Sequence, residues 1–399
     1  MKTFRSGAAI LAALFAVQAP AAFAAEVGVT DTEITIGVFG PMSGQLAAFG
    51  FDPVQAAKMW YEEVNKKGGI NGRKIKVIVE DDKCNPTEVV AVVKKLATVD
   101  KAFIANGGSC SAAVAAAQEF ATREKFPLVM LNAAGDVAVF PPTRYVFGAF
   151  GGTQRAVGGT IMEFAIKELK GKKIAYIADD NDFGNANWAV AKAVAERMGA
   201  QVVAVERIPP NINDVTAPML KIRAANPDVI VSTSYPAATV LLAQKYAEFG
   251  MTRIPLVVAV QGVPVPAVFA KNVGNDAALV NMYYGSPLND LTDGPKQQRW
   301  ITMYKQYYPD RTPGAFMTYG LPSAMAITQA IEKAGRDLTR EKFITALETV
   351  SFESGVLGGA TAFGPDRRDG YRSSVFIKFD GKTHTLMPGV YTWNGKDGM

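Results

Sequence analysis

Two serines flank a cysteine in the run Gly107-Gly108-Ser109-Cys110-Ser111, between a stretch typical of a strand and a stretch of small residues typical of a helix. Glycines let a backbone approach a ligand closely, and the start of a helix offers unpaired N–H groups at the positive end of its dipole. Together with the hydroxyls of Ser109 and Ser111, such a loop can hold a carboxylate. A serine that only caps the helix is the alternative interpretation.

Nucleophilic catalysis by one of these serines would need a base, and the chain has a single histidine, His384. We expect His384 in a C-terminal hairpin at the surface, away from the serines. A secreted hydrolase that uses Ser109 or Ser111 is therefore an alternative class, and it would lose turnover on the substitution His384→Ala. Our prediction is that the protein is not an enzyme.

The counts and motifs also argue against metal and nucleotide chemistry. One histidine and two cysteines, Cys84 and Cys110, cannot form a His-rich or an all-cysteine zinc site. Asp179, Asp180 and Asp182 could hold calcium, but their spacing matches an EF-hand loop poorly, and a solvated loop or a helix cap is favoured. Neither a Gly-x-Gly-x-x-Gly run after the first strand nor a phosphate loop occurs. We expect no metal and no cofactor.

The first 24 residues have the pattern of a secretory signal peptide. Lys2 and Arg5 precede an apolar run over residues 8–17, and Ala22-Phe23-Ala24 offers a cleavage site, so we expect cleavage after Ala24. Export to an oxidising compartment favours a disulfide between the two cysteines over two buried thiols. The formal net charge of +5, or +3 after cleavage, is too weak to indicate a nucleic-acid partner.

Strand and helix patterns alternate in two series along the mature chain. The first series has predicted strands at 34–39, 74–80, 102–105 and 127–131, with helices that begin at Asp52-Pro53, at 87 and at Ser111. Asp52 is expected to cap its helix. The second series has predicted strands at 173–178, 202–205, 228–233 and 255–260, separated by helices at 186–198, 215–225 and 237–249. This alternation predicts an α/β fold of two doubly wound lobes, each with a parallel sheet covered on both faces.

Three later helices, at 296–307, 322–334 and 341–347, have too little strand beside them to form a third sheet. We assign them to the first lobe, and the alternating segment 373–393, with its hairpin signal Asp380-Gly381, to the second. The chain then crosses between the lobes in the Gly-rich segment 147–152, near 281–286 and near 355–364. The predicted division is 1–24 for the signal peptide, 25–150 plus 285–355 for the N-terminal lobe, and 151–284 plus 356–399 for the C-terminal lobe.

Doubly wound sheets bind ligands outside the carboxyl ends of their strands, here in a cleft between the lobes. The loops expected to line the cleft are 40–50, 106–111, 132–136, 179–184, 234–236 and 261–263. Phe49, Phe183 and Tyr235 lie in these loops. They could form the walls of an apolar pocket, although aromatic residues at strand ends are commonly part of the core.

Several runs, taken together, resemble the branched-chain amino-acid binding proteins, which are the periplasmic leucine/isoleucine/valine receptors of ABC importers. They are Gly40-Pro41-Met42-Ser43-Gly44, Lys67-Gly68-Gly69-Ile70-Asn71-Gly72, Asp81-Asp82-Lys83-Cys84-Asn85-Pro86, Cys110-Ser111, Asp182-Phe183-Gly184 and Tyr235-Pro236. The resemblance covers nearly the whole mature chain. It implies the type I periplasmic-binding fold, a clamshell of two lobes with three hinge crossings that binds a small solute without catalysis.

The resemblance also implies partners and site residues. The solute would be delivered from the periplasm to an ABC permease in the inner membrane, and we expect a monomer. Cys84 and Cys110 match a disulfide of the family, and Ser111 matches the serine that holds the ligand carboxylate. Ala134 and Gly135 match the loop that supplies backbone contacts and a threonine hydroxyl. Phe49, Phe183 and Tyr235 match positions where family members place tyrosines around the ligand.

This sequence departs from the family at two of those positions. Gly135 has no hydroxyl where amino-acid binders have threonine, and Gln261 stands where they have a glutamate that pairs with the ligand ammonium. A buried ammonium needs a charged partner, and an amide provides only a dipole. We therefore hypothesise a carboxylate ligand without an α-amino group, and Phe49, Phe183 and Tyr235 would suit an aromatic acid such as a benzoate or a cinnamate.

Two alternatives stay open at this point. In a true branched-chain amino-acid binder, an acid from another loop, such as Asp136 or Asp182, would take the ammonium. A periplasmic sensor that passes its ligand state to a receptor kinase would use the same clamshell, so the sequence does not separate sensing from transport.

Overall fold

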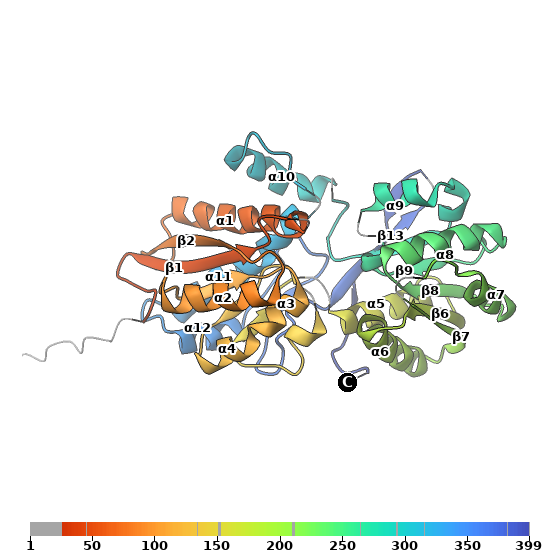
Figure 1. Ribbon diagram of the computed structural model, residues 1–399, viewed down its shortest axis with the longest axis horizontal. Helices are drawn as coiled ribbons and strands as arrows, with labels where there is room; N and C mark the ends of the chain where they lie inside the picture. The colour runs from red at the N-terminus through yellow and green to blue at the C-terminus, as the bar shows by residue number, and fades with distance from the viewer. Residues whose placement is uncertain are drawn as a thin grey trace, which may run out of the picture.

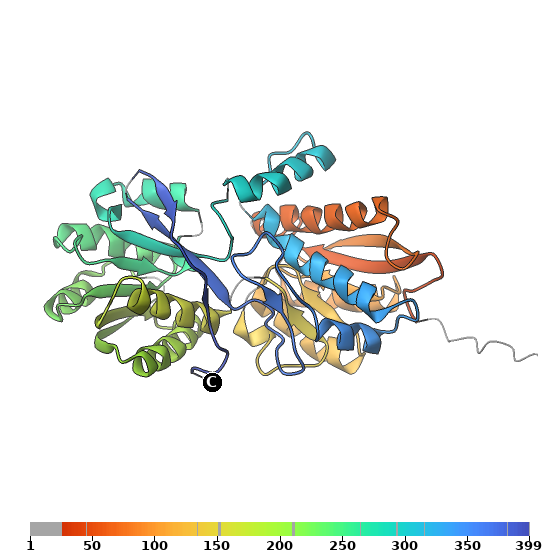
Figure 2. The ribbon, with the colours of Figure 1, turned by 180° about the vertical axis from the view of Figure 1, so that it is seen from behind.

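The computed structural model describes residues 26–398, apart from 45, 134, 151–152, 210–211, 264, 293, 315 and 381. The predicted signal peptide, its cleavage site after Ala24 and the site residue Ala134 lie outside the described residues. Two α/β lobes stand side by side and are joined by segments of chain near the middle of the molecule (Figures 1 and 2). Among the described helices, none is both long enough and apolar enough to cross a membrane.

The first lobe is built on a parallel sheet of five strands, β1 (Glu33–Gly40), β2 (Lys74–Asp81), β3 (Ile104–Gly107), β4 (Leu128–Met130) and β5 (Val146–Gly148). Their spatial order is β2-β1-β3-β4-β5, with Ile36 opposite Ile104 where β1 pairs with β3. The four predicted strands are confirmed. The fifth, β5, takes up Phe147 and Gly148, which the sequence analysis assigns to a crossing.

Helices cover both faces of this sheet. One face carries α1 (Phe51–Lys66), α11 (Leu321–Ala334) and α12 (Arg340–Leu347), whose apolar side chains share one core cluster. The other carries α2 (Pro86–Thr98), α3 (Ser111–Ala116) and α4 (Gln118–Arg123), which share another. The late helices α11 and α12 therefore belong to the first lobe, as predicted, and α10 (Pro295–Tyr307) packs beside α1 through Trp300 and Tyr304.

Asp52 does not cap α1, contrary to the prediction. The helix begins one residue earlier, at Phe51, and its N-cap is Gly50, which has no side chain to offer. The carboxylate of Asp52 accepts hydrogen bonds from the Tyr304 hydroxyl at 2.6 Å and from the Gly314 N–H at 2.8 Å. Asp52 is therefore occupied with holding α10 and the following loop, and the helix start relies on its backbone alone.

The second lobe contains a larger sheet. Its parallel part consists of β6 (Lys173–Asp179), β7 (Gln201–Ile208), β8 (Val229–Thr233), β9 (Leu256–Val258) and β10 (Met282–Ser286), in the order β7-β6-β8-β9-β10. The sheet continues with β13 (Ser373–Phe379), which runs antiparallel to β10 and forms the predicted hairpin with β14 (His384–Leu386). The segment 282–286, near which a crossing is predicted, is the strand β10, so the chain leaves this lobe only after Ser286.

Two helices, α5 (Gln154–Lys167) and α6 (Asp182–Met198), share a core cluster on one face of this sheet. On the other face, α7 (Thr216–Ala224), α8 (Pro236–Glu248) and α9 (Pro266–Val273) share a second cluster. The α/β class and the two doubly wound lobes are confirmed by this arrangement.

Three connections join the elements of one lobe to those of the other. The chain leaves the first sheet after β5, leaves the second sheet after β10, and returns to it at β13. Neighbouring segments support one another there, since Leu288 bridges to Leu357 and Gly148 to Asp369. The exact division at residues 150, 284 and 355 stays a prediction.

Candidate ligand-binding site

The strand orders locate the site. In each sheet, the chain winds outward from a central pair, β1 and β3 in the first lobe and β6 and β8 in the second. The connections leave such a pair toward opposite faces, so a crevice opens at the carboxyl ends of its two strands. The segments after β1 and β3 carry Phe49 and Ser109. Phe183 lies in the first turn of α6, which follows β6, and Tyr235 follows β8 as the N-cap of α8.

A cavity of about 420 Å³ lies between these loops, in the size range of small-molecule sites. Its lining combines aromatic rings with small and polar uncharged side chains from both lobes. These residues are Phe49, Ser109, Ser111, Asn132, Gly135, Phe150, Gln154, Val157, Phe183, Tyr235, Pro236, Val260, Gln261, Pro287, Phe316, Tyr319, Ser373 and Ser374. The structure thus brings together every predicted ligand-binding residue that it describes. Whether they bind a ligand stays a prediction.

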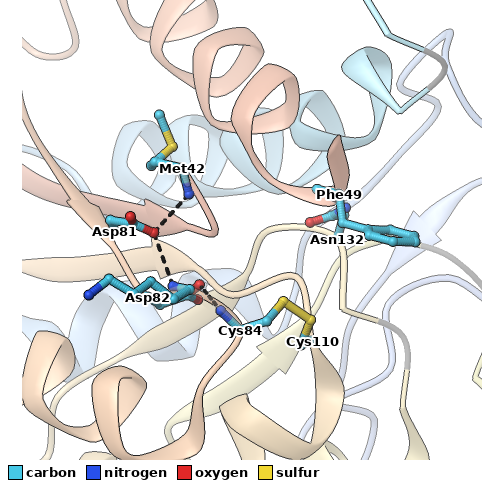
Figure 3. Close-up of a disulfide and its surroundings, with 8 residues drawn as sticks. Met42, Phe49, Asp81, Asp82, Cys84, Cys110 and Asn132 are labelled. Atoms are coloured by element: carbon cyan, nitrogen blue, oxygen red, sulfur yellow. Dashed lines mark hydrogen bonds between the residues drawn. A yellow bond between two sulfur atoms is a disulfide. The ribbon is translucent and has the colours of Figure 1, made fainter. Parts of the chain in front are cut away.

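A disulfide between Cys84 and Cys110 anchors the serine loop, as predicted (Figure 3). Cys110 is the N-cap residue of α3, so the bridge ties the start of that helix to the segment after β2. Beside it, the buried carboxylate of Asp82 accepts a hydrogen bond from the Cys84 N–H at 2.9 Å. Burial raises the pKa of Asp82 to about 6. The disulfide therefore ties Cys110, between Ser109 and Ser111, to a segment whose conformation Asp82 helps to hold.

The two serines differ in what they contact. Ser111 Oγ accepts a hydrogen bond from the Gly135 N–H at 2.7 Å, so its own proton can still be donated toward the cavity. The buried Oγ of Ser109 has no hydrogen-bond partner among the described residues. Two hydroxyls thus belong to this side of the cavity lining, and hydroxyl donors of this kind can hold a carboxylate.

Aromatic rings form two walls. In the first lobe, Phe49 stacks on Phe316 at 5.0 Å between ring centroids, and Phe316 contacts Tyr319 edge-on at 5.3 Å. Phe150 stacks on Tyr319 at 4.0 Å. Phe150, Phe316 and Tyr319 are lining residues that are not among the predicted ligand-binding residues. Phe316 and Tyr319 directly precede α11. The only sequence signal for them is their position before a late helix that returns to the first lobe.

The facing wall comes from the second lobe, where Phe183 and Tyr235 stack at 4.8 Å. Desolvation by burial, followed by the nearby carboxylate of Asp179, raises the pKa of the Tyr235 phenol, so this group stays neutral. Asp179 is buried, and its Oδ2 accepts the Tyr235 N–H at 2.9 Å. This acid therefore positions the Tyr235 loop.

Gln261 lies in a short 3-10 turn at Val260–Gly262, and its Oε1 is buried without a hydrogen-bond partner among the described residues. No Asp, Glu, Lys, Arg or His occurs among the described residues that line the cavity. Asp136 is not a lining residue and forms an ion pair with Arg155 at 3.4 Å, and Asp182 is exposed in the first turn of α6. Neither acid is placed to receive a ligand ammonium.

The remaining candidate groups serve other roles. Asn181, between the clustered aspartates, caps α6 by accepting the Gly184 N–H at 2.9 Å. Across the described part of the chain, no group of three or more His, Cys, Asp and Glu residues could hold a metal ion. His384 lies in the predicted hairpin but is half-buried, stacked on Phe379 and 3.0 Å from the Tyr284 hydroxyl. It is not among the residues that line the cavity with the serines.

Comparisons with known proteins give a consistent result. A family model described as periplasmic binding protein matches residues 33–383. A Pseudomonas aeruginosa protein named amino acid binding protein is 30% identical over 229 residues, which cover 55% of this chain and 59% of that protein. A leucine-, isoleucine-, valine-, threonine- and alanine-binding protein of the same organism is 26% identical over 350 residues, which cover 88% of this chain and 91% of that protein.

Solved structures share the fold. An ABC transporter substrate-binding protein from Sphaerobacter thermophilus has a TM-score of 0.75 at 19% identity and covers 90% of this chain and 98% of its own. A solute-binding protein of an ABC transporter from Rhodopseudomonas palustris HaA2, in complex with p-hydroxybenzoic acid, has a TM-score of 0.68 at 20% identity. It covers 90% of this chain and 97% of its own.

Proposed function

The chain belongs to the periplasmic binding protein family, and from this premise we propose that it binds a small carboxylate without an α-amino group, foremost an aromatic acid. It is the periplasmic solute-binding component of an ABC importer of the branched-chain amino-acid type. The family that the motifs suggested and its type I fold are confirmed by the family match and the solved structures.

The absence of charge among the described lining residues carries this proposal. An α-ammonium enclosed in the cleft would lose its hydration and find only amide and hydroxyl dipoles. Removing one member of a buried ion pair costs about 3–5 kcal/mol, and an ammonium opposite Gln261 would be in that position. A carboxylate fits better, because the hydroxyls of Ser109 and Ser111 can both donate to it, while the Gly135 N–H holds Ser111 Oγ in place.

The walls favour an aromatic body for the ligand. The ladder of Phe49, Phe316 and Tyr319 faces the stacked pair of Phe183 and Tyr235 across a cavity whose volume suits a single substituted ring. Aromatic pairs add about 0.5–1.5 kcal/mol beyond the burial of their area. The likeness to a protein solved with p-hydroxybenzoic acid supports the same ligand class.

The cycle requires binding and closure only, with no cofactor and no bond broken. The carboxylate docks on the serine loop of the first lobe, where Gly135 holds Ser111 in place. The second lobe then closes over the ring with Phe183, Tyr235 and Gln261, and closure excludes water. The exported monomer, cleaved after Ala24, would carry the enclosed ligand to its permease in the closed conformation.

A branched-chain amino-acid binder is the second candidate, and the named specificities of the relatives favour it. The uncharged cavity does not, because neither Asp136 nor Asp182 lines it. A sensor would bind the same ligand and differ only in its partner.

A thermal-shift screen of the mature protein tests the proposal. The panel holds benzoates, phenylpropionates, branched-chain amino acids and short dicarboxylates. A ligand at about 100 times its dissociation constant adds about 2.7 kcal/mol to the free energy of unfolding. We expect the aromatic acids to raise Tm. Stabilisation by leucine but by none of the aromatic acids would overturn the proposal.

A further inference from the structure

We infer that Asn132 is a specificity-determining residue, a fixed hydrogen-bond acceptor that selects ligands with a donor group, such as a ring hydroxyl, in addition to the carboxylate. The inference rests on the proposed function and deepens it, since it narrows the ligand from an aromatic acid to a hydroxylated one.

The position of Asn132 is set by the first lobe. It follows β4 in the chain and is 9% exposed, and its backbone N–H donates to the Gly108 carbonyl at 3.4 Å. Its side chain lies beside Phe49, where Nδ2 donates to the Phe49 carbonyl oxygen at 2.9 Å (Figure 3). Asn132 and Phe49 both line the cavity, so this bond connects a polar lining residue to the aromatic wall of the first lobe.

That bond also fixes which way the amide points. Only the amide nitrogen can donate to a carbonyl, so the partner of Nδ2 determines that the other atom is the acceptor Oδ1. Oδ1 is buried and has no hydrogen-bond partner among the described residues. Asn132 therefore brings to the cavity lining an acceptor whose orientation cannot be reversed without losing the bond to Phe49.

A carboxylate does not satisfy this acceptor, because an ionised carboxylate only accepts hydrogen bonds. A ligand that covers Oδ1 with a ring carbon leaves a buried acceptor without a partner, and sites built to bind a hydroxyl reject analogues that lack it. A ring hydroxyl supplies the missing donor at no cost in charge. An ammonium could also donate, but the lining residues offer no carboxylate to balance it.

The second lobe offers a matched control. Asn187 in α6 is fully buried, its Nδ2 donates to the Phe183 carbonyl at 2.8 Å, and its Oδ1 also lacks a partner among the described residues. Asn187 repeats the bonding of Asn132 to a cavity phenylalanine, but it does not line the cavity. A purely structural effect should appear in both asparagines, and an effect on ligand choice only in Asn132.

The test compares dissociation constants by calorimetry for 2-, 3- and 4-hydroxybenzoate and for the fluorobenzoates substituted at the same ring positions. Fluorine is close to a hydroxyl in size and donates nothing. The proteins are the mature chain and its variants Asn132→Leu, Asn132→Asp and Asn187→Leu. Asn132→Asp keeps an acceptor oxygen but loses the bond to the Phe49 carbonyl and adds a negative charge, so it is judged by the ratio of the two dissociation constants and not by affinity.

We expect the wild-type protein to bind at least one hydroxybenzoate 10-fold or more tightly than its fluoro counterpart, a ratio typical of one buried hydrogen bond. The ratio should fall to about one in Asn132→Leu and persist in Asn132→Asp and Asn187→Leu. A ratio near one in the wild type, or an unchanged ratio in Asn132→Leu, would overturn the inference and leave the proposed function standing. Failure of every benzoate to bind would overturn the proposed function, and the role of Asn132 with it.

Discussion

The Gly135 N–H donates a hydrogen bond to Ser111 Oγ at 2.7 Å, and the two residues pack in direct contact. A Cβ added at position 135 would lie 2.7 Å from Ser111 Oγ and closer still to Ser111 Cβ. The missing threonine hydroxyl at this position is therefore more than a lost donor. The Ser111 side chain occupies the space that a side chain at position 135 would fill, and Ser111 Oγ accepts its hydrogen bond from the main chain.

Gly135→Thr should consequently weaken binding of a carboxylate. The added side chain displaces Ser111, and a misplaced charge-assisted hydrogen bond costs about 1.5–3 kcal/mol, which corresponds to about 10-fold to 100-fold in Kd. Calorimetric titration with benzoate measures the change. Gly285→Ala is the control, because a Cβ there has its nearest neighbour at 3.6 Å. Tighter binding in Gly135→Thr would show that position 135 still accepts the threonine of the amino-acid binders.

The Cys84–Cys110 disulfide should contribute to both stability and affinity. The two cysteines are 26 residues apart in the chain, and closing a loop of that length stabilises a fold by about 3 kcal/mol in the chain-entropy model. We expect the double variant Cys84→Ser, Cys110→Ser to unfold at lower temperature and to bind benzoate more weakly, because Cys110 lies between Ser109 and Ser111. Thermal unfolding of the wild type with and without reductant provides the comparison. Equal Tm values in the oxidised, reduced and double-variant proteins would contradict this.

Asp82 should make the protein less stable as the pH rises from about 4 to about 6. Burial, and then the neighbouring charge of Asp81, raises the pKa of Asp82 to about 6 in the folded state, above its ordinary value near 4, although the Cys84 N–H opposes the shift. The folded state therefore holds this proton in that window while the unfolded state releases it, and the free energy of unfolding falls by at most about 1.4 kcal/mol per pH unit.

Urea unfolding at pH 4.5 and pH 6.5 measures this effect, with Asp82→Asn as the comparison. The variant should lose this part of the pH dependence and be at least as stable as the wild type at pH 6.5. A wild type and variant with parallel pH profiles would exclude Asp82 as the origin.

The fold followed closely from the sequence because its pattern is local. Each β-branched run between turn residues became a strand, and each lobe repeats the same winding. The predictions that the structure corrects depend on contacts between residues far apart in the sequence. Residues 282–286 form a strand where the sequence predicts a crossing, because nothing local shows that they pair with β9 and with the distant β13. Asp52 looked like a helix cap because its partners Tyr304 and Gly314 lie some 250 residues later in the chain.

The candidate site was predicted only in part for the same reason. Ser109, Phe183 and Tyr235 come soon after strands, so they are predicted by the rule that such sheets bind ligands at the carboxyl ends of their strands. Phe316 and Tyr319 reach the cavity from a late segment that returns to the first lobe, which no strand pattern indicates. Asn132 lies in a loop that the prediction included, but its importance depends on the bond to Phe49, and a tertiary contact of this kind cannot be read from one sequence.

Gln261→Glu should shift ligand preference toward α-amino acids. The new carboxylate would face the cavity, attract an ammonium and repel a second acid, so the ratio of Kd for L-phenylalanine to Kd for 3-phenylpropionate should fall at least 10-fold. Gln154→Glu carries the same charge change to another part of the lining and is the control. If both variants shift the ratio equally, or neither does, position 261 does not select against the ammonium.

The central claim is that this cleft accepts a carboxylate and has no place for an α-ammonium. The most direct measurement is calorimetric titration of the mature wild-type protein with pairs that differ only in the amino group: 3-phenylpropionate with L-phenylalanine, and 4-methylpentanoate with L-leucine. We predict that the acid binds at least 10-fold more tightly than its amino counterpart in any pair that binds, and that the aromatic acid is preferred. Binding of either amino acid as tightly as its acid would contradict the account.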